Sequence, residues 1–196
     1  VALAALNVDG KAALFSIDTA TGSATKLGEF TGSGMVKAIA IPTNPVAYAI
    51  DEMNNFFIID PTNISATVSK QITGTVAGEM MEAIDFRPLN GQLYGFGKAG
   101  NLYTINASSG AAALVGTGSF ATLNGNYFGF DFNPTVDRIR VVTSNGQNLR
   151  LNPETGTVAV TDLNINGVAN AMITGVAYTN NIAGVKRRFP RQIVAR

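Results

Sequence analysis

Two residue types that carry much of protein chemistry are missing from this chain of 196 residues, which contains no histidine and no cysteine. Without cysteine there is no disulfide, no thiolate nucleophile and no zinc–thiolate site. Without histidine there is no Ser-His-Asp triad, and the commonest metal ligand is absent. Any catalysis would therefore depend on carboxylates, tyrosine, lysine or a bound cation.

The sequence also lacks tryptophan and any run of about 18 apolar residues, the length expected of a membrane-spanning helix. The absence of tryptophan weakens the case for a sugar-stacking platform, although tyrosine can serve in its place. We expect no membrane span.

Charge is sparse and unevenly distributed. Residues 1–184 hold nine Lys and Arg against thirteen Asp and Glu, whereas residues 185–196 hold five basic residues and no acid. This contrast predicts one domain over residues 1–184 and a flexible basic tail over 185–196. The tail either binds an anionic surface such as nucleic acid or is a solvated chain end. Its candidate binding residues are Lys186, Arg187, Arg188 and Arg191.

The sequence contains a pattern that recurs four times, about every 46 residues. Each copy has a short apolar segment that ends in Asp or Asn, and three copies continue to a glycine four residues later. Periods of about 40–50 residues with four strands per period are typical of propeller blades. The acidic or amide positions are Asp18, Asp60, Asn106 and Asn152, and the glycines are Gly22, Gly110 and Gly156.

A second register supports this period. Residue pairs that tolerate positive φ recur at 9–10, 54–55, 99–100 and 145–146, where each copy needs a tight hairpin. Inner strands are predicted at 38–41, 81–86, 127–132 and 173–178.

The sequence therefore predicts an all-β fold, a small β-propeller of four blades of about 46 residues each. The chain opens on three predicted strands, 4–8, 13–18 and 24–29, with no inner strand before them. We expect the C-terminal strand 173–178 to join these N-terminal strands and close the ring, because closure removes unpaired sheet edges.

Three long motifs characterise the second half of the chain: AIDFRP at 83–88, GFDFNPTVDRIRVV at 129–142 and GQNLRLNP at 146–153. They resemble those of a bacterial secreted family known only as a domain of unknown function. The resemblance covers about residues 80–181 and implies an exported, propeller-like domain with no assigned activity or site residues. Residues 185–196 match none of its motifs, from which we expect a truncated chain with an unrelated tail.

The densest polar cluster lies in the second of these motifs. Asp131, Asn133 and Asp137 offer oxygens that suit a hard cation such as Ca²⁺. The structural alternative, which we favour, is that Asn133 opens a turn, Asp137 caps it, and the nearby arginines pair with carboxylates of a neighbouring blade. A calcium loop would also carry more acids and a glycine at its bend.

Asp85 and Arg87 occupy the places of Asp131 and Asn133 one repeat earlier. A group that recurs in successive repeats favours a role in building the blades. If Asp85 and Asp131 point into a central channel, they could line an ion site. Glycosidase chemistry would require two carboxyl groups about 5–10 Å apart, one of them with a raised pKa.

These features favour a non-catalytic, secreted or extracellular bacterial module. It would act as a structural unit or protein-binding platform, and its partner would be itself or another extracellular protein, reached through exposed outer strands. One alternative is a cation-dependent, lactonase-like propeller hydrolase with Ca²⁺ as its cofactor, and another is a glycan-binding module. The leading hypothesis requires no cofactor, and nucleic acid would bind only through the basic tail.

Overall fold

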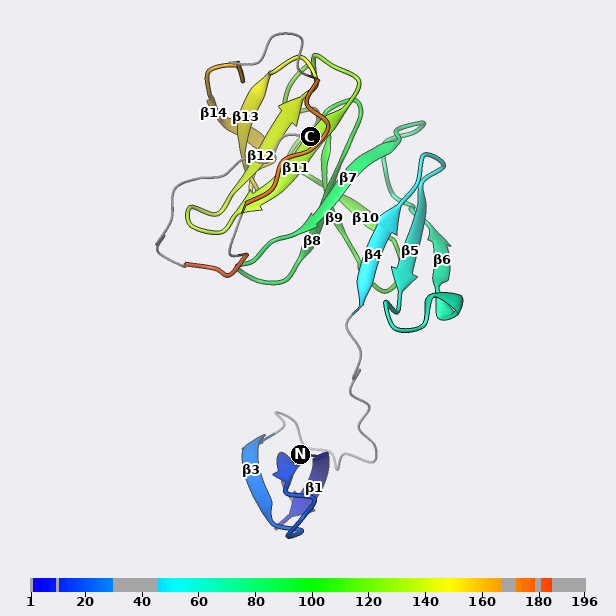
Figure 1. The fold of residues 1–196 in the computed structure, drawn as a ribbon, viewed down its shortest axis with the longest axis vertical. Coiled ribbons are helices and arrows are strands. Elements are labelled where there is room, and N and C mark those ends of the chain that lie inside the picture. Colours follow the sequence, from blue (N-terminus) through cyan, green and yellow to red (C-terminus); the bar gives the residue numbers. More distant parts are fainter. Residues whose placement is uncertain (1, 10, 30–45, 167–171, 179–180, 185–196) are drawn as a thin grey trace. The chain divides into compact units, whose positions relative to one another are not determined.

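A computed structural model of the protein describes residues 2–9, 11–29, 46–166, 172–178 and 181–184 (Figure 1). By their contacts the residues divide into two compact units, Val1–Pro45 and Val46–Arg196. The described secondary structure is antiparallel β-sheet apart from one short 3₁₀ helix, which confirms the all-β prediction.

The first unit contains a three-stranded sheet in the order β1-β2-β3. Its first hairpin turns at Asp9, where φ is 50°, and Ala12 and Ala13 of the central strand are buried. The strands are β1 (Ala2–Val8), β2 (Lys11–Ile17) and β3 (Ala24–Glu29).

The second unit contains three successive sheets, each a meander of consecutive antiparallel strands. The first sheet consists of β4 (Ala47–Ile50), β5 (Asn55–Ile59) and β6 (Val68–Gln71), with the 3₁₀ helix η1 (Ile64–Ala66) before its last strand. The next consists of β7 (Met81–Phe86), β8 (Leu93–Gly97), β9 (Leu102–Ile105) and β10 (Ala112–Val115). The last consists of β11 (Phe128–Asn133), β12 (Arg138–Thr143), β13 (Asn148–Asn152) and β14 (Thr157–Thr161).

The Asp/Asn repeat marks the same turn in all four sheets. At the end of β2, β5, β9 and β13, a side-chain oxygen accepts the backbone N–H two residues ahead, which closes an Asx turn. The glycine four residues after the Asp or Asn has φ of 74° at Gly22, 76° at Gly110 and 65° at Gly156. The donors to Asp18, Asp60, Asn106 and Asn152 are Ala20, Thr62, Ser108 and Glu154, at 2.8, 2.8, 3.0 and 3.0 Å.

The hairpins between second and third strands also recur, with one correction. The predicted turn at 54–55 is displaced by one residue, because Asn54 has φ of 60° and Asn55 already begins β5. Asn54 therefore corresponds to Gly100 and Gly146, whose φ angles are 86° and 87°. Equivalent turn positions in the second unit are thus all 46 residues apart.

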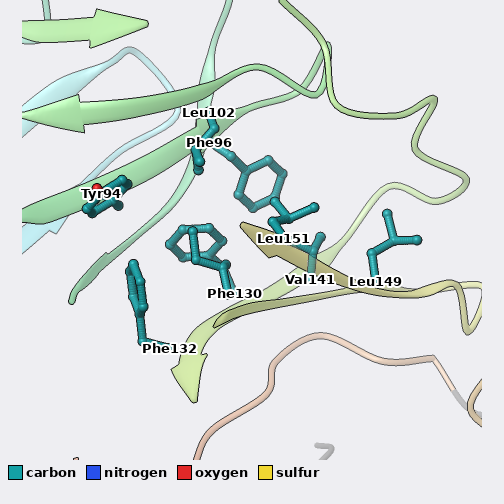
Figure 2. Packing of buried hydrophobic residues seen from close by; sticks show 9 residues of the cluster. Tyr94, Phe96, Leu102, Phe130, Phe132, Val141, Leu149 and Leu151 are labelled. Atoms are coloured by element: carbon teal, nitrogen blue, oxygen red, sulfur yellow. The ribbon is translucent and has the colours of Figure 1, made fainter. Parts of the chain in front are cut away.

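The central strands β8 and β9 of the sheet β7–β10 are buried on both faces. Alternation along β8 sends Leu93 to one face and Tyr94 to the other. The face that carries Leu93 packs against the sheet β4–β6, and the face that carries Tyr94 packs against the sheet β11–β14 (Figure 2). The first cluster contains Phe56, Ile72, Met81, Leu93, Tyr103 and Ile105, and the second contains Tyr94, Phe96, Leu102, Phe130, Phe132, Ile139, Val141, Leu149 and Leu151.

An aromatic contact repeats at both junctions. The Tyr48 and Phe86 rings meet edge to face with centroids 5.3 Å apart, and the Tyr94 and Phe132 rings, each 46 residues later, do the same at 5.3 Å. Successive sheets of the second unit therefore pack by one repeated geometry.

The predicted inner strands have different outcomes. Residues 81–86 form β7 as expected, and the segment expected at 127–132 is observed one residue later as β11. Residues 38–41 lie outside the described residues. Ile173–Tyr178 is not a β-strand, because it forms no backbone ladder with any strand of the described ranges. Closure of a ring through this segment stays a prediction.

Candidate functional site: polar contacts between successive sheets

Aspartates at equivalent inner-strand positions connect one sheet to the next. The backbone N–H of Phe132 on β11 donates to Oδ2 of Asp85 on β7 at 2.8 Å. The backbone N–H of Tyr178 donates to Oδ2 of Asp131 on β11 at 2.7 Å. Ile173–Tyr178 therefore bears the same relation to β11 as β11 bears to β7. A side chain supplies this contact, which explains why the segment is close to β11 without forming a ladder.

The same two aspartates interact with one another. Burial, and after it the neighbouring Asp85 carboxylate, raises the pKa of Asp131 to about 7. Burial also raises the pKa of Asp85, against hydrogen bonds from the N–H groups of Phe132 and Phe86 and from Asp131. We therefore predict that the pair shares a proton, as adjacent carboxyl groups do. Glycosidase chemistry by this pair stays a prediction.

Arg87 links the same two sheets at another point. It follows β7, and its guanidinium forms two hydrogen bonds with the Asp137 carboxylate in the β11–β12 turn, at 2.8 and 2.5 Å. A third contact, at 2.5 Å, reaches Glu154 in the β13–β14 turn. Arg87 is only 4% exposed. The fork geometry of arginine suits this paired recognition of carboxylates.

Arg140 is the second buried arginine. Its Nη1 contacts Oδ1 of Asn148 and Oδ2 of Asp162, both at 2.5 Å, and its Nε donates to the Tyr178 hydroxyl at 3.1 Å. Arg150 binds the other oxygen of Asp162 at 2.6 Å. Burial works against ionisation of Asp162, but the two arginines lower its pKa overall.

Each predicted cation ligand has a protein partner in the structure. Asp131 binds the Tyr178 N–H, Asp137 binds Arg87, and Asn133 accepts the N–H of Thr135 at 3.0 Å. Asp137 also helps to form the turn, because its N–H donates to the Asn133 carbonyl at 3.0 Å and its φ is 49°. Within the described ranges, no three acidic side chains cluster where they could hold a metal ion. The Ca²⁺ site stays a prediction.

The predicted pairing of arginines with carboxylates of a neighbouring sheet occurs at Arg87, for which the repeat predicted a role in building the sheets. Arg140 pairs instead with Asp162, which follows the last strand of its own sheet. The basic-tail residues Lys186, Arg187, Arg188 and Arg191 lie outside the described residues.

Glu79 is a buried carboxylate that sequence reasoning missed. It lies just before β7 and accepts the Ala99 N–H at 3.0 Å, the Asn101 amide at 2.8 Å and the Tyr103 hydroxyl. Burial, followed by the hydrogen bond to Glu79, raises the pKa of Tyr103 to about 12. A Cβ on Gly97 would overlap the Glu79 side chain, so this glycine leaves room for the carboxylate.

The equivalent turn one sheet earlier shows why that carboxylate is needed. There Asp51 occupies the place of Gly97, and its carboxylate accepts the N–H of Met53 at 2.9 Å and the amide of Asn55 at 2.8 Å. Met53 and Asn55 correspond to Ala99 and Asn101. Glu79, which lies just before β7, therefore supplies the same carboxylate that Asp51 supplies from within the turn. A missing acid at position 97 was the available signal in the sequence.

A hollow of ≈ 250 Å³ lies beside β4 and β7. Asp85 is the one acidic group in its wall, which is otherwise mostly apolar. The wall includes Val46, which directly follows the undescribed residues 30–45, and we assign the hollow no ligand. Its lining residues are Val46, Ala47, Tyr48, Ile84, Asp85, Phe86 and Leu93.

Comparison with known families identifies residues 53–189 as a domain of unknown function, DUF4394. The chain belongs to the DUF4394 family. The match includes the region in which the three motifs predicted a family resemblance and extends further toward both ends. It includes residues 185–189, which were expected to match nothing in the family. A comparison with curated proteins finds no match to this DUF4394 chain.

Two solved structures of AztD from Citrobacter koseri are distantly similar to the DUF4394 chain. The apo structure has 13% sequence identity and a TM-score of 0.42, covering 84% of this chain and 45% of AztD. The second has 13% identity and a TM-score of 0.40, covering 81% and 43%. The chain thus spans less than half the length of AztD. No helix in the described residues is long and apolar enough to cross a membrane.

Replacing Asp131 with Asn tests the shared proton. The pKa of Asp131 is higher in the folded chain than in the unfolded chain. Its contribution to the free energy of unfolding is therefore complete below about pH 4 and is lost as the pH rises through about 7. The substituted amide would keep an acceptor for the Tyr178 N–H and add a permanent donor. In urea unfolding, D131N should match the wild type near pH 4.5 and exceed it near pH 8 by about 1–2 kcal/mol, allowing for partial exposure.

The control is Asp60→Asn, which makes the same charge change at an exposed Asx turn where Asn106 and Asn152 already carry the amide. This variant should keep the wild-type pH dependence. An equal pH slope in D131N and the wild type would contradict the shared proton.

Replacing Arg87 with Met tests the link between the last two sheets. The substitution leaves Asp137 and Glu154 without their buried cation, although both carboxylates can reach water. We expect a loss of about 2–4 kcal/mol in the free energy of unfolding, somewhat below the range for a fully buried broken pair. Arg138→Met, at a half-buried arginine on β12, should cost less than about 1 kcal/mol. Equal losses in the two variants would show that Arg87 has no special role.

Proposed function

We propose that this DUF4394 chain is a non-catalytic extracellular module that acts as a structural unit or protein-binding platform. The observation that carries this proposal is the use of its buried polar groups. Asp85 and Asp131 bind backbone of the next inner strand or segment, and Arg87 joins two sheets. Side chains committed to assembling sheets are not free to perform acid–base or nucleophilic steps.

We propose further that the four sheets are blades of one small propeller, closed by Ile173–Tyr178 and the N-terminal strands. A third repetition of the inner-strand contacts supports this proposal. Tyr178 meets Arg140 and Asp131 as Phe132 meets Tyr94 and Asp85. These contacts support an inner-strand role for the segment, which an edge partner would complete.

The outer strands are the proposed association surface. In the second unit, β6, β10 and β14 each end a sheet, although the N–H of Ala112 on β10 donates to the Thr73 carbonyl at 2.7 Å. Such edges can add strands from another chain. Val160 on β14 is 39% exposed and would lie in this contact.

Light scattering of the full chain over a concentration series tests the proposal. The mean mass should rise with concentration, and Val160→Lys should suppress the rise because charged edges block strand addition. Val136→Lys, at a 51% exposed turn residue, should behave as the wild type. Ca²⁺ should neither raise the melting temperature nor produce hydrolysis of lactone or ester substrates.

A strict monomer that hydrolyses lactones or esters with Ca²⁺ would contradict the proposal. In that case Asp131→Ala should abolish the Ca²⁺-dependent stabilisation, as the cation-dependent hydrolase requires. Specific retention of the chain on a glycan array, lost on substitution of loop Asn or Tyr residues, would instead favour the glycan-binding module.

A further inference from the structure

One face of the sheet β11–β14 is rich in arginine. Arg138 and Arg140 lie two residues apart on β12 and therefore on the same face, and Arg150 pairs directly across from Arg140 on β13. We call these three residues the arginine face. They are three of the four arginines in residues 1–184, a region whose net charge is negative. Such clustering indicates a local positive potential on an acidic body.

This face departs from the repeat. In the two preceding sheets, the equivalent face is mainly apolar and packs against the next sheet. In the last sheet the same positions are charged or polar. Equivalent positions in the three sheets are 46 residues apart. The position of Arg140 is Tyr48 and Tyr94 in the two preceding sheets, that of Asn148 is Phe56 and Leu102, and that of Arg150 is Ile58 and Thr104.

The positive charge of the face is only partly neutralised. Asp162 is the carboxylate shared by Arg140 and Arg150, so two guanidinium groups have one anion between them. Asp131 lies opposite Arg140 on the same face, but burial raises its pKa and it already binds Tyr178. The buried Nε of Arg150 has no hydrogen-bond partner among the described residues.

Arg150 is also accessible. Its side chain is 31% exposed, against 5% for Arg140. The counterpart Thr104 stays half-buried even though the next sheet packs against its face. A further sheet packed in the same way would therefore leave position 150 open to solvent.

We propose that the arginine face binds a carboxylate group, with Arg150 as the principal contact and Arg138 and Arg140 beside it. A carboxylate matches the planar fork of a guanidinium, and it would supply the second negative charge that Asp162 alone does not provide. The carboxylate can belong to a small organic acid or to an acidic side chain of a partner. This site does not depend on whether the module is catalytic or self-associating.

The test is NMR observation of the arginine Nε–H resonances in the full chain, titrated with succinate at constant ionic strength. The Arg150 resonance, assigned by its loss in Arg150→Gln, should shift in a saturable manner. Affinity measured by calorimetry should fall at least about tenfold in Arg150→Gln and several-fold in Arg150→Lys, which keeps the charge but not the fork. Lys98→Gln removes one exposed positive charge elsewhere and should leave affinity unchanged.

A peptide of glutamates whose backbone ends are blocked distinguishes the two sources of the carboxylate. Tighter binding of this peptide than of succinate supports an acidic partner, and tighter binding of succinate supports a small acid. The proposal fails if neither probe shifts Arg150, if Arg150→Gln and Lys98→Gln lose affinity equally, or if inorganic phosphate binds more tightly than both carboxylate probes.

Discussion

The hydrogen bond from a backbone N–H to an aspartate of the preceding inner strand is the interaction on which the second unit depends. β11 pairs with β12 on one edge alone, so the N–H of Phe132 points away from its own sheet. Apolar packing between sheets is non-directional, whereas a buried hydrogen bond fixes one position along the strand. Asp85 and Asp131 impose that position twice, and each raises or lowers the pKa of the other.

Successive sheets meet the same structural need with different residues. The hairpin carboxylate is Asp51 in one sheet and Glu79 in the next, and Gly97 makes the exchange sterically possible. The contact to the next inner position is made by Tyr94 at one junction and by Arg140 at the following one. The repeat therefore constrains geometry more than residue type. Positions that change character between repeats, above all Arg150, are the places where the last sheet departs from the two before it.

The strands and turns could be predicted because their causes are local. Asp60 and Asn106 act on backbone two residues away, and glycines such as Gly110 adopt positive φ within the same turn. The inter-sheet contacts could not, since Arg87 and Asp137 are 50 residues apart and the repeat contains no second copy of that pair. For the same reason, the sequence did not predict which protein groups would bind the expected cation ligands. The sequence does not distinguish a carboxylate that binds a metal ion from one that binds a neighbouring sheet.

Hydrogen exchange of the Phe132 and Tyr178 amides tests this account most directly, because neither N–H has a ladder partner and each is held by one aspartate. If the aspartates position successive sheets, both amides should exchange as slowly as the amides in the core of β12. Asp85→Ala should then raise the exchange rate of the Phe132 amide selectively. Exchange of both amides at the rate of unprotected backbone in the wild-type chain would contradict the account.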